Sequence, residues 1–221
     1  MNTGPAIAAT LFLALLGGMA DASQQGPAPA KAEAPLPRAA GWRADLDLRF
    51  WQGDRFYPDM VATVQRLAAS HGPEQTAVIL DAAELYLTHM LLYEAGSTLA
   101  GLSPARPDHL RRHRALQDAR ALLNGEALED FASSPLAEVE RPDRAFWQSL
   151  HAIATSDVQL LTDSIEDSFA GLAMQSRAVL TDLLPVFVEA AIETRHFDYA
   201  DAALDLMKEL PELDQSPQGT S

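Results

Sequence analysis

Apolar residues recur at intervals of three and four along residues 41–211, which is the spacing of one buried face of an α-helix. The run Leu80, Ala83 and Leu87 is a clear example. Strictly alternating apolar and polar runs bounded by strand-type turns, the pattern of a half-buried strand, are missing from this stretch. The pattern therefore predicts an all-α domain over residues 41–211.

Helix-breaking residues divide this pattern into pairs of short helices. The breaks expected within pairs are Gly53, Asn124-Gly125, Thr155–Asp157 and Thr194–His196. The breaks expected between pairs are Gly72-Pro73, residues 104–107, Pro135 and Pro142. We expect residues 170–180 to be an insertion or an unusually long helix. We expect Pro185 to kink the first helix of the last pair or to mark the start of that helix.

The pairs also resemble one another in sequence. Tyr57, Tyr93 and Tyr199 each stand near the expected start of a second helix. From Tyr57 to Tyr93 is 36 residues, and from Tyr57 to Tyr199 is 142, which is four intervals averaging 35.5. Leu128 and Leu160 occupy the two intermediate places. Five copies at this spacing predict a stacked array of helical hairpins.

Residues 197–203 resemble the turn into the second helix of the tetratricopeptide-repeat family, with Tyr199 and Ala202 at its packing positions. Tyr93 and Gly96 are similarly placed in the second repeat. The resemblance implies a right-handed α-solenoid of about five helix-turn-helix hairpins, each of about 34 residues. The family's regular Gly in the first helix is absent and the closing Pro is irregular. A generic α-helical bundle is the alternative.

The resemblance also implies where a partner would bind. In this family the concave face, lined mainly by the first helices of the hairpins, holds an extended peptide or a partner helix. On that face we expect contacts from Arg43, Asp47, Trp51, Glu84 and His151. The aromatic residues Trp42, Trp147 and Phe146 are either further anchors or, as we favour, core residues packed between helices.

The first 22 residues have the features of a secretory signal peptide. An apolar stretch precedes Ala20-Asp-Ala22, a small-x-small ending that predicts cleavage after Ala22 and export to the periplasm. No Lys or Arg precedes Lys31, so an uncleaved anchor is the alternative. Residues 23–40 are rich in Pro and Ala and predict a disordered linker, and residues 212–221 predict a frayed tail.

The formal net charge of −15 argues against nucleic acid and anionic membrane surfaces as partners, because both need a concentrated basic face. Membrane contact is expected only through partners or an uncleaved leader. The chain has no Cys, which excludes disulfides and thiol catalysis. Composition thus leaves other exported proteins as the expected partners; the oligomeric state is left open.

Arg111, Arg112 and Arg114 form a local reversal of sign in this acidic chain. We expect this patch to be a second partner contact, for example for an acidic peptide. The alternative is pairing within the chain to carboxylates of the next expected helix, at Glu126, Glu129 and Asp130.

His109 and His113 have a spacing that can hold zinc, but the surrounding arginines would repel a cation, so no metal and no cofactor is expected. The sequence has no Gly-x-Ser-x-Gly elbow, no Ser-x-x-Lys and no phosphate-binding Gly loop. These features predict a non-catalytic periplasmic scaffold that assists an envelope protein complex. The alternatives are a structural subunit of a large envelope machine and a cell-wall hydrolase with a carboxylate site.

Overall fold

The computed structural model describes residue 46, residue 48 and residues 55–210, and over these residues the protein is all-α, as the sequence predicts. It contains eight α-helices and two short 3₁₀ turns, with no strand in the described residues. The elements are α2 (Phe56–Ala69), α3 (Gly72–Thr88), α4 (Leu92–Ala100), α5 (Pro107–Leu123), η3 (Phe131–Ser133), η4 (Pro135–Ala137), α6 (Arg144–Thr155), α7 (Val158–Ala173), α8 (Arg177–Glu193) and α9 (Phe197–Glu209).

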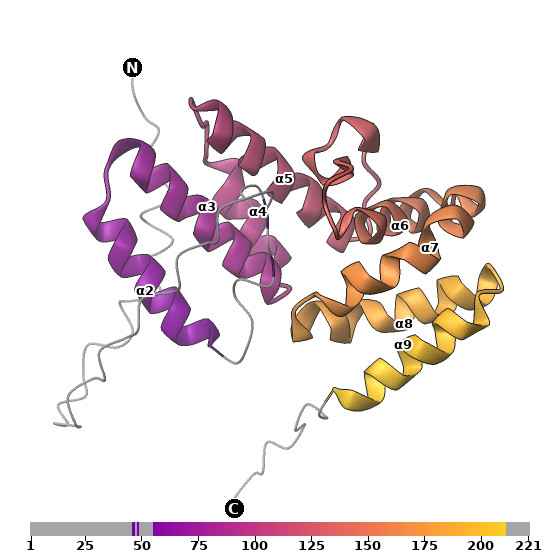
Figure 1. Cartoon of the computed structure of the whole chain (residues 1–221). Coiled ribbons are helices and arrows are strands. Elements are labelled where there is room, and N and C mark those ends of the chain that lie inside the picture. Colours follow the sequence, from indigo (N-terminus) through magenta and orange to yellow (C-terminus); the bar gives the residue numbers. More distant parts are fainter. Residues whose placement is uncertain (1–45, 47, 49–54, 211–221) are drawn as a thin grey trace, which may run out of the picture.

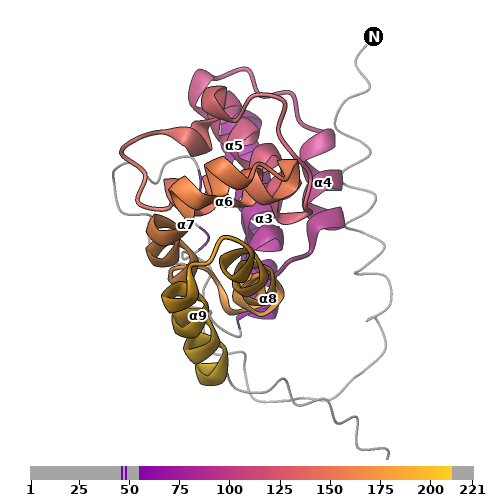
Figure 2. The ribbon, with the colours of Figure 1, turned by 90° about the vertical axis from the view of Figure 1, so that its right-hand side faces the viewer.

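The helices form successive layers along the chain. Helices α2–α5 lie on one side of the molecule and α6–α9 on the other (Figure 1). Seen from the side, α6 and α7 lie between α5 and the α8/α9 pair (Figure 2). One apolar core runs from α3 to α9, and its largest fully buried side chains include Phe146, Trp147 and Phe187. The expected core role of Phe146 and Trp147 is confirmed.

Among residues 55–210, three of the expected hairpins are present, formed by α3/α4, α6/α7 and α8/α9. The helix that opens each hairpin ends in the same turn, with a residue of positive φ at Met90, Ser156 and Arg195. In each turn the next N–H bonds to the carbonyl five residues earlier, and the positive-φ residue bonds to the carbonyl three residues earlier, which is a Schellman motif. Gly125 gives α5 the same ending. Four helix ends thus repeat one local device.

The third expected hairpin has no second helix, so the prediction of a helix near Leu128 is wrong. Residues 124–143, which we call the 124–143 segment, cross the surface with only η3 and η4. Asp130 accepts a hydrogen bond from the backbone of Ser133, and Ser134 accepts one from the backbone of Leu136. Such side chains compete with helical hydrogen bonds, and Pro135 lacks the N–H that a helix interior needs.

The expectation that these tyrosines share a packing position is also wrong. Tyr199 is buried, with 7% of its surface exposed, but Tyr57 is 66% and Tyr93 is 79% exposed. In α4 the buried positions are Ala95 and Leu99 instead, so that helix packs in a different register. The tyrosines are regularly spaced in the sequence, but they do not occupy equivalent packing positions in the structure.

Residues 170–180 are neither an insertion nor one long helix. Helix α7 ends at Ala173 and α8 begins at Arg177, where Ser176 caps it by accepting from the backbone of Val179. The Ser176 hydroxyl also donates to the Thr88 carbonyl at 2.5 Å, tying this turn to the end of α3. Pro185 lies inside α8, which continues through it to Glu193, so Pro185 does not mark the start of that helix.

Candidate functional site

Helix α5 divides the arginine cluster between the surface and the interior. Arg111 and Arg114 are exposed, whereas Arg112 has only 7% of its surface exposed. Because successive helical residues are rotated by about 100°, neighbours in the sequence face different environments. The Arg112 guanidinium donates to Asp81 at 2.7 Å and to Glu84 at 2.5 Å, both on α3. Two of the three arginines therefore remain on the surface.

The burial of Arg112 and Glu84 corrects our expectation that they contact a partner. Glu84 has no exposed surface, and its carboxylate pairs with Arg112 inside the protein. Asp81 also pairs with Arg66 of α2, at 2.7 Å. These ion pairs link α2, α3 and α5, and a partner side chain cannot reach Glu84 or Arg112 in this conformation. Arg43, Asp47 and Trp51 lie outside the described residues.

His151 contacts the 124–143 segment. Its Nδ1 accepts a hydrogen bond from the backbone of Leu128 at 3.3 Å, and its ring stacks on Phe131 with the centroids 5.3 Å apart. Burial lowers the pKa of His151, although the nearby Asp157 opposes this shift. The neutral imidazole is the form that can accept this hydrogen bond. His151 thus helps to position the segment against α6.

His109 and His113 lie on one face of α5 but do not form a metal site. His113 is buried, and its Nε2 is 2.9 Å from the carbonyl oxygen of Leu99. His109 lies 3.9 Å from Asp108. In the described part of the chain, no group of three or more His, Cys, Asp or Glu side chains is placed to hold a metal ion.

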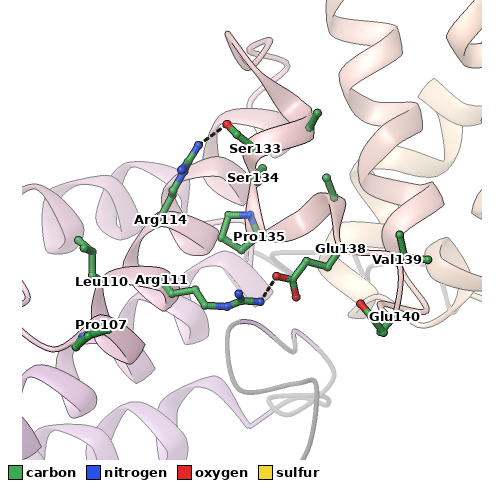
Figure 3. Close-up of a pocket in the computed structure, with 12 residues that line it drawn as sticks. Pro107, Leu110, Arg111, Arg114, Ser133, Ser134, Pro135, Glu138, Val139 and Glu140 are labelled. Atoms are coloured by element: carbon green, nitrogen blue, oxygen red, sulfur yellow. Dashed lines mark hydrogen bonds and ion pairs between the residues drawn. The ribbon is translucent and has the colours of Figure 1, made fainter.

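An open groove of about 760 Å³ lies between α5 and the 124–143 segment (Figure 3). Arg111 reaches across it to pair with Glu138, and Arg114 donates to the Ser133 hydroxyl at 2.8 Å. Neither arginine pairs with Glu126, Glu129 or Asp130 in the contacts described; Glu126 pairs with Arg120 instead, at 3.1 Å. We call this feature the α5 groove.

Exposed apolar side chains lie on both sides of the α5 groove. Leu110 on α5 is 55% exposed, and Val139 on the opposite wall is 78% exposed. Pro107 adds further exposed apolar surface, and the buried Pro135 also lines the groove. Large apolar side chains are usually withdrawn from water, so a groove that presents several of them is suited to contact another molecule.

A buried polar contact holds the wall of the α5 groove in place. Ser134 donates through its hydroxyl to Asp118 of α5 at 2.5 Å. Burial raises the pKa of Asp118, while the Ser134 hydroxyl and Arg114 act in the opposite direction. The 124–143 segment is therefore held against α5 by the contacts of Ser133 and Ser134, and the groove is preformed.

Two of the groove residues, Arg111 and Arg114, are among those expected from the sequence, whereas the apolar ones are not. A usable signal was present: Leu110 stands within a run of charged residues, and Val139 stands alone between Glu138 and Glu140. An apolar residue isolated among charges is poorly placed for a core, because its neighbours in the sequence need solvent.

No family model matches the sequence, and no curated protein and no solved structure matches the chain. The resemblance to tetratricopeptide repeats accordingly stays a prediction. Among the described residues, none of the helices combines the length and the apolar character that crossing a bilayer requires. The geometry of the α5 groove is therefore the basis for the functional argument.

Proposed function

We propose that this protein is a non-catalytic scaffold that binds an extended segment of another envelope protein in the α5 groove. The observation that supports this most is the exposure of Leu110 and Val139 on opposite walls of an open, preformed groove. Apolar side chains of the bound segment would contact these two residues. Because the walls are already held in place, binding would order few groups of the scaffold.

The two exposed arginines would orient the bound segment. Arg111 and Arg114 flank the apolar lining and present guanidinium groups that can donate to carbonyl or carboxylate oxygens. Arg111 now pairs with Glu138, and such exposed pairs are worth about 0–1 kcal/mol, so a bound carboxylate can replace Glu138 at little expense. The groove therefore combines apolar contact with exchangeable polar contacts.

We further propose that the helices form a divergent tetratricopeptide-like solenoid. Three hairpins and four repeated Schellman turns support this interpretation. The 124–143 segment would take the place of one second helix, and the α5 groove would be created by that replacement. A helix at this place would satisfy its own backbone hydrogen-bonding groups. The 124–143 segment instead leaves an open space beside α5.

The proposed location is the periplasm, with export directed by residues 1–22. This proposal depends on the apolar stretch and on the small residues at Ala20 and Ala22. The alternative role as a structural subunit is favoured by exposed apolar side chains outside the groove, namely Ile192, Phe197 and Leu204. The hydrolase alternative lacks such support in the groove, because Glu138 is engaged by Arg111.

The test of this function is affinity capture from a periplasmic fraction with the full chain as bait. Leu110→Asp combined with Val139→Asp places two carboxylates in the apolar lining, and we expect the captured proteins to be lost. The control combines Tyr93→Asp with Val158→Asp, which are exposed positions in the first turns of α4 and α7, where a carboxylate is tolerated.

Circular dichroism and the denaturation midpoint should show that both double variants fold like the wild type. Retention of the same captured proteins by the groove variant would contradict the proposed function. Arg112 is left unchanged in these variants, since reversing its charge would place like charges together beside the buried Glu84.

A further inference from the structure

Helices α7–α9 carry a large excess of exposed negative charge. Residues 157–209 contain eleven Asp or Glu and three Lys or Arg, and all eleven acidic side chains are exposed. Residues 55–156 contain thirteen acidic and nine basic residues, so their charges are much closer to balance. The net charge of the protein is therefore concentrated on its C-terminal hairpins.

A hollow of about 440 Å³ opens between α7 and the start of α9 within this acidic region. Three aromatic side chains line it, Phe169, Phe197 and Tyr199. The rings of Phe169 and Tyr199 meet edge to face with centroids 5.4 Å apart, and the Tyr199 hydroxyl lies 3.0 Å from the Ser168 hydroxyl. We call this feature the α7/α9 hollow; its aromatic wall is fixed by packing from below.

Phe197 leaves the hollow with an exposed aromatic surface. It is the first residue of α9 and is 58% exposed, an unusual position for a Phe that has no contact role. The carboxylates of Glu166 and Asp198 also line the hollow. His196 holds one side: its Nδ1 is 2.9 Å from the Thr194 hydroxyl and its Nε2 is 3.8 Å from Glu166.

We propose that the α7/α9 hollow docks a basic segment of a partner protein, with a Lys or Arg side chain placed over the aromatic wall. A cation is attracted to the face of an aromatic ring, and Glu166 and Asp198 add opposite charge at the same place. Arg195 also lines the hollow, so its two carboxylates outnumber the single guanidinium.

Charge selects this occupant over the others that an exposed apolar surface can accept. A second copy of the chain docking through the same region would bring two acidic surfaces together, which is unfavourable at ordinary ionic strength. Nucleic acid and anionic lipid are repelled for the same reason. A basic protein segment instead gains from both the aromatic surface and the surrounding field.

This surface lies on helices different from those of the α5 groove, so its test does not depend on the proposed function. Fluorescence anisotropy of the full chain with a labelled Gly-Lys-Leu repeat peptide measures the affinity directly. The matched peptide has Gln in place of each Lys, and we expect its affinity to be lower by about tenfold or more. Equal binding of the two peptides would overturn the proposal.

Variants then place the site on the protein. Phe197→Leu keeps an apolar side chain but removes the ring, and should weaken the Lys peptide about two- to fivefold. Glu166→Gln combined with Asp198→Asn should weaken it about fivefold. The control with the same change of charge is Asp182→Asn combined with Glu189→Gln, both exposed on α8 and outside the hollow.

Two further outcomes would also overturn the proposal. If the α8 control weakens binding as much as the hollow variant, the general field of the acidic surface accounts for the affinity. If spermidine displaces the peptide at the peptide's own dissociation constant, the hollow selects small cations and not a protein segment. Loss of peptide binding with intact capture through the α5 groove would be the signature expected of the hollow variants alone.

Discussion

The two halves of the protein satisfy their buried polar groups in different ways. In residues 55–156, arginines pair with carboxylates, as Arg112 does with Asp81 and Glu84 between α3 and α5. In residues 157–209 the buried contacts of α7 are between hydroxyls: Ser164 meets Ser149 of α6 at 2.9 Å, and Ser168 meets Tyr199. The first half therefore buries some of its ion pairs, whereas all eleven acidic side chains of the second half are exposed.

Close packing of small residues is a feature of the second half. Gly171 of α7 lies against α6 so closely that an added Cβ would be 2.8 Å from the Cβ of Phe146 and 3.1 Å from the Cα of Asp143. Small residues let helices approach and bury continuous apolar surface. The acidic side chains lie on the outer faces of these helices, which suits the proposed binding of a basic partner.

The largest expected effect is the loss of the buried guanidinium in the first half. Arg112→Met leaves Glu84 and Asp81 without this cation in the interior, and we expect the free energy of unfolding to fall by about 3–5 kcal/mol. Urea denaturation monitored by circular dichroism measures this. Arg114→Met, at an exposed pair with Asp118, should change stability by about 1 kcal/mol or less. Similar losses of unfolding free energy in both variants would show that the burial of Arg112 does not determine its contribution to stability.

A matched pair of glycines tests whether the second half depends more on close packing. Gly171→Ala pushes a methyl group into the backbone of α6, so we expect a loss of about 1–3 kcal/mol. Gly96→Ala meets only the flexible Arg120 side chain, at 3.2 Å, and removes a helix-interior glycine. It should be neutral or stabilising by up to about 1 kcal/mol. The thermal midpoint should fall for Gly171→Ala and should stay the same or rise for Gly96→Ala.

The hydroxyl contact of Tyr199 gives the second half a dependence on alkaline pH. Tyr199→Phe removes the partner of Ser168 and should cost about 1 kcal/mol at neutral pH. Burial raises the pKa of Tyr199 to about 12. Between an unfolded pKa of about 10 and this value, only the unfolded chain releases the proton, so the wild type loses stability as the pH rises.

Phe cannot ionise, and the difference between Tyr199→Phe and the wild type should therefore shrink between about pH 8 and pH 11. Urea denaturation at the two pH values provides the measurement. A difference that stays constant would mean that the Tyr199 hydroxyl titrates alike in the folded and unfolded chains.

The smallest expected effect concerns surface charge. Asp167→Lys places a cation four residues after Asp163 on α7, and should stabilise the protein by about 0.3–0.5 kcal/mol at low salt. Glu126→Lys in the first half breaks the pair with Arg120 and should destabilise by a similar amount. Both effects should fade at high salt. The same sign for both reversals would contradict the difference in charge balance between the halves.

The part of the fold that the sequence predicted well is local. The turns expected at Asn124-Gly125, Thr155–Asp157 and Thr194–His196 all end helices. The expected second helix after Gly125 failed although its start signal was present, because Asp130, Ser134 and Pro135 redirect the backbone. Hydroxyl and carboxylate caps of this kind act over two or three residues and are easily missed in a periodicity that spans ten or more.

The candidate site was predicted less completely than the fold. Arg111 and Arg114 were found because charge is visible in the sequence, but Arg112 was grouped with them although it is buried. Its burial depends on Asp81 and Glu84, which lie 31 and 28 residues away. A run of like charges does not show which of its members finds a counter-ion inside the protein.

By itself, the sequence determined the helices, most of their ends and the acidic character of the chain. Those features follow from backbone sterics, from hydrogen bonds spanning about five residues, and from composition. Only the tertiary structure decided which face of each helix is buried, so that Tyr199 lies inside while Tyr93 is exposed, and that Leu110 and Val139 line the same groove. Burial is a relation between distant segments, and no local pattern contains it.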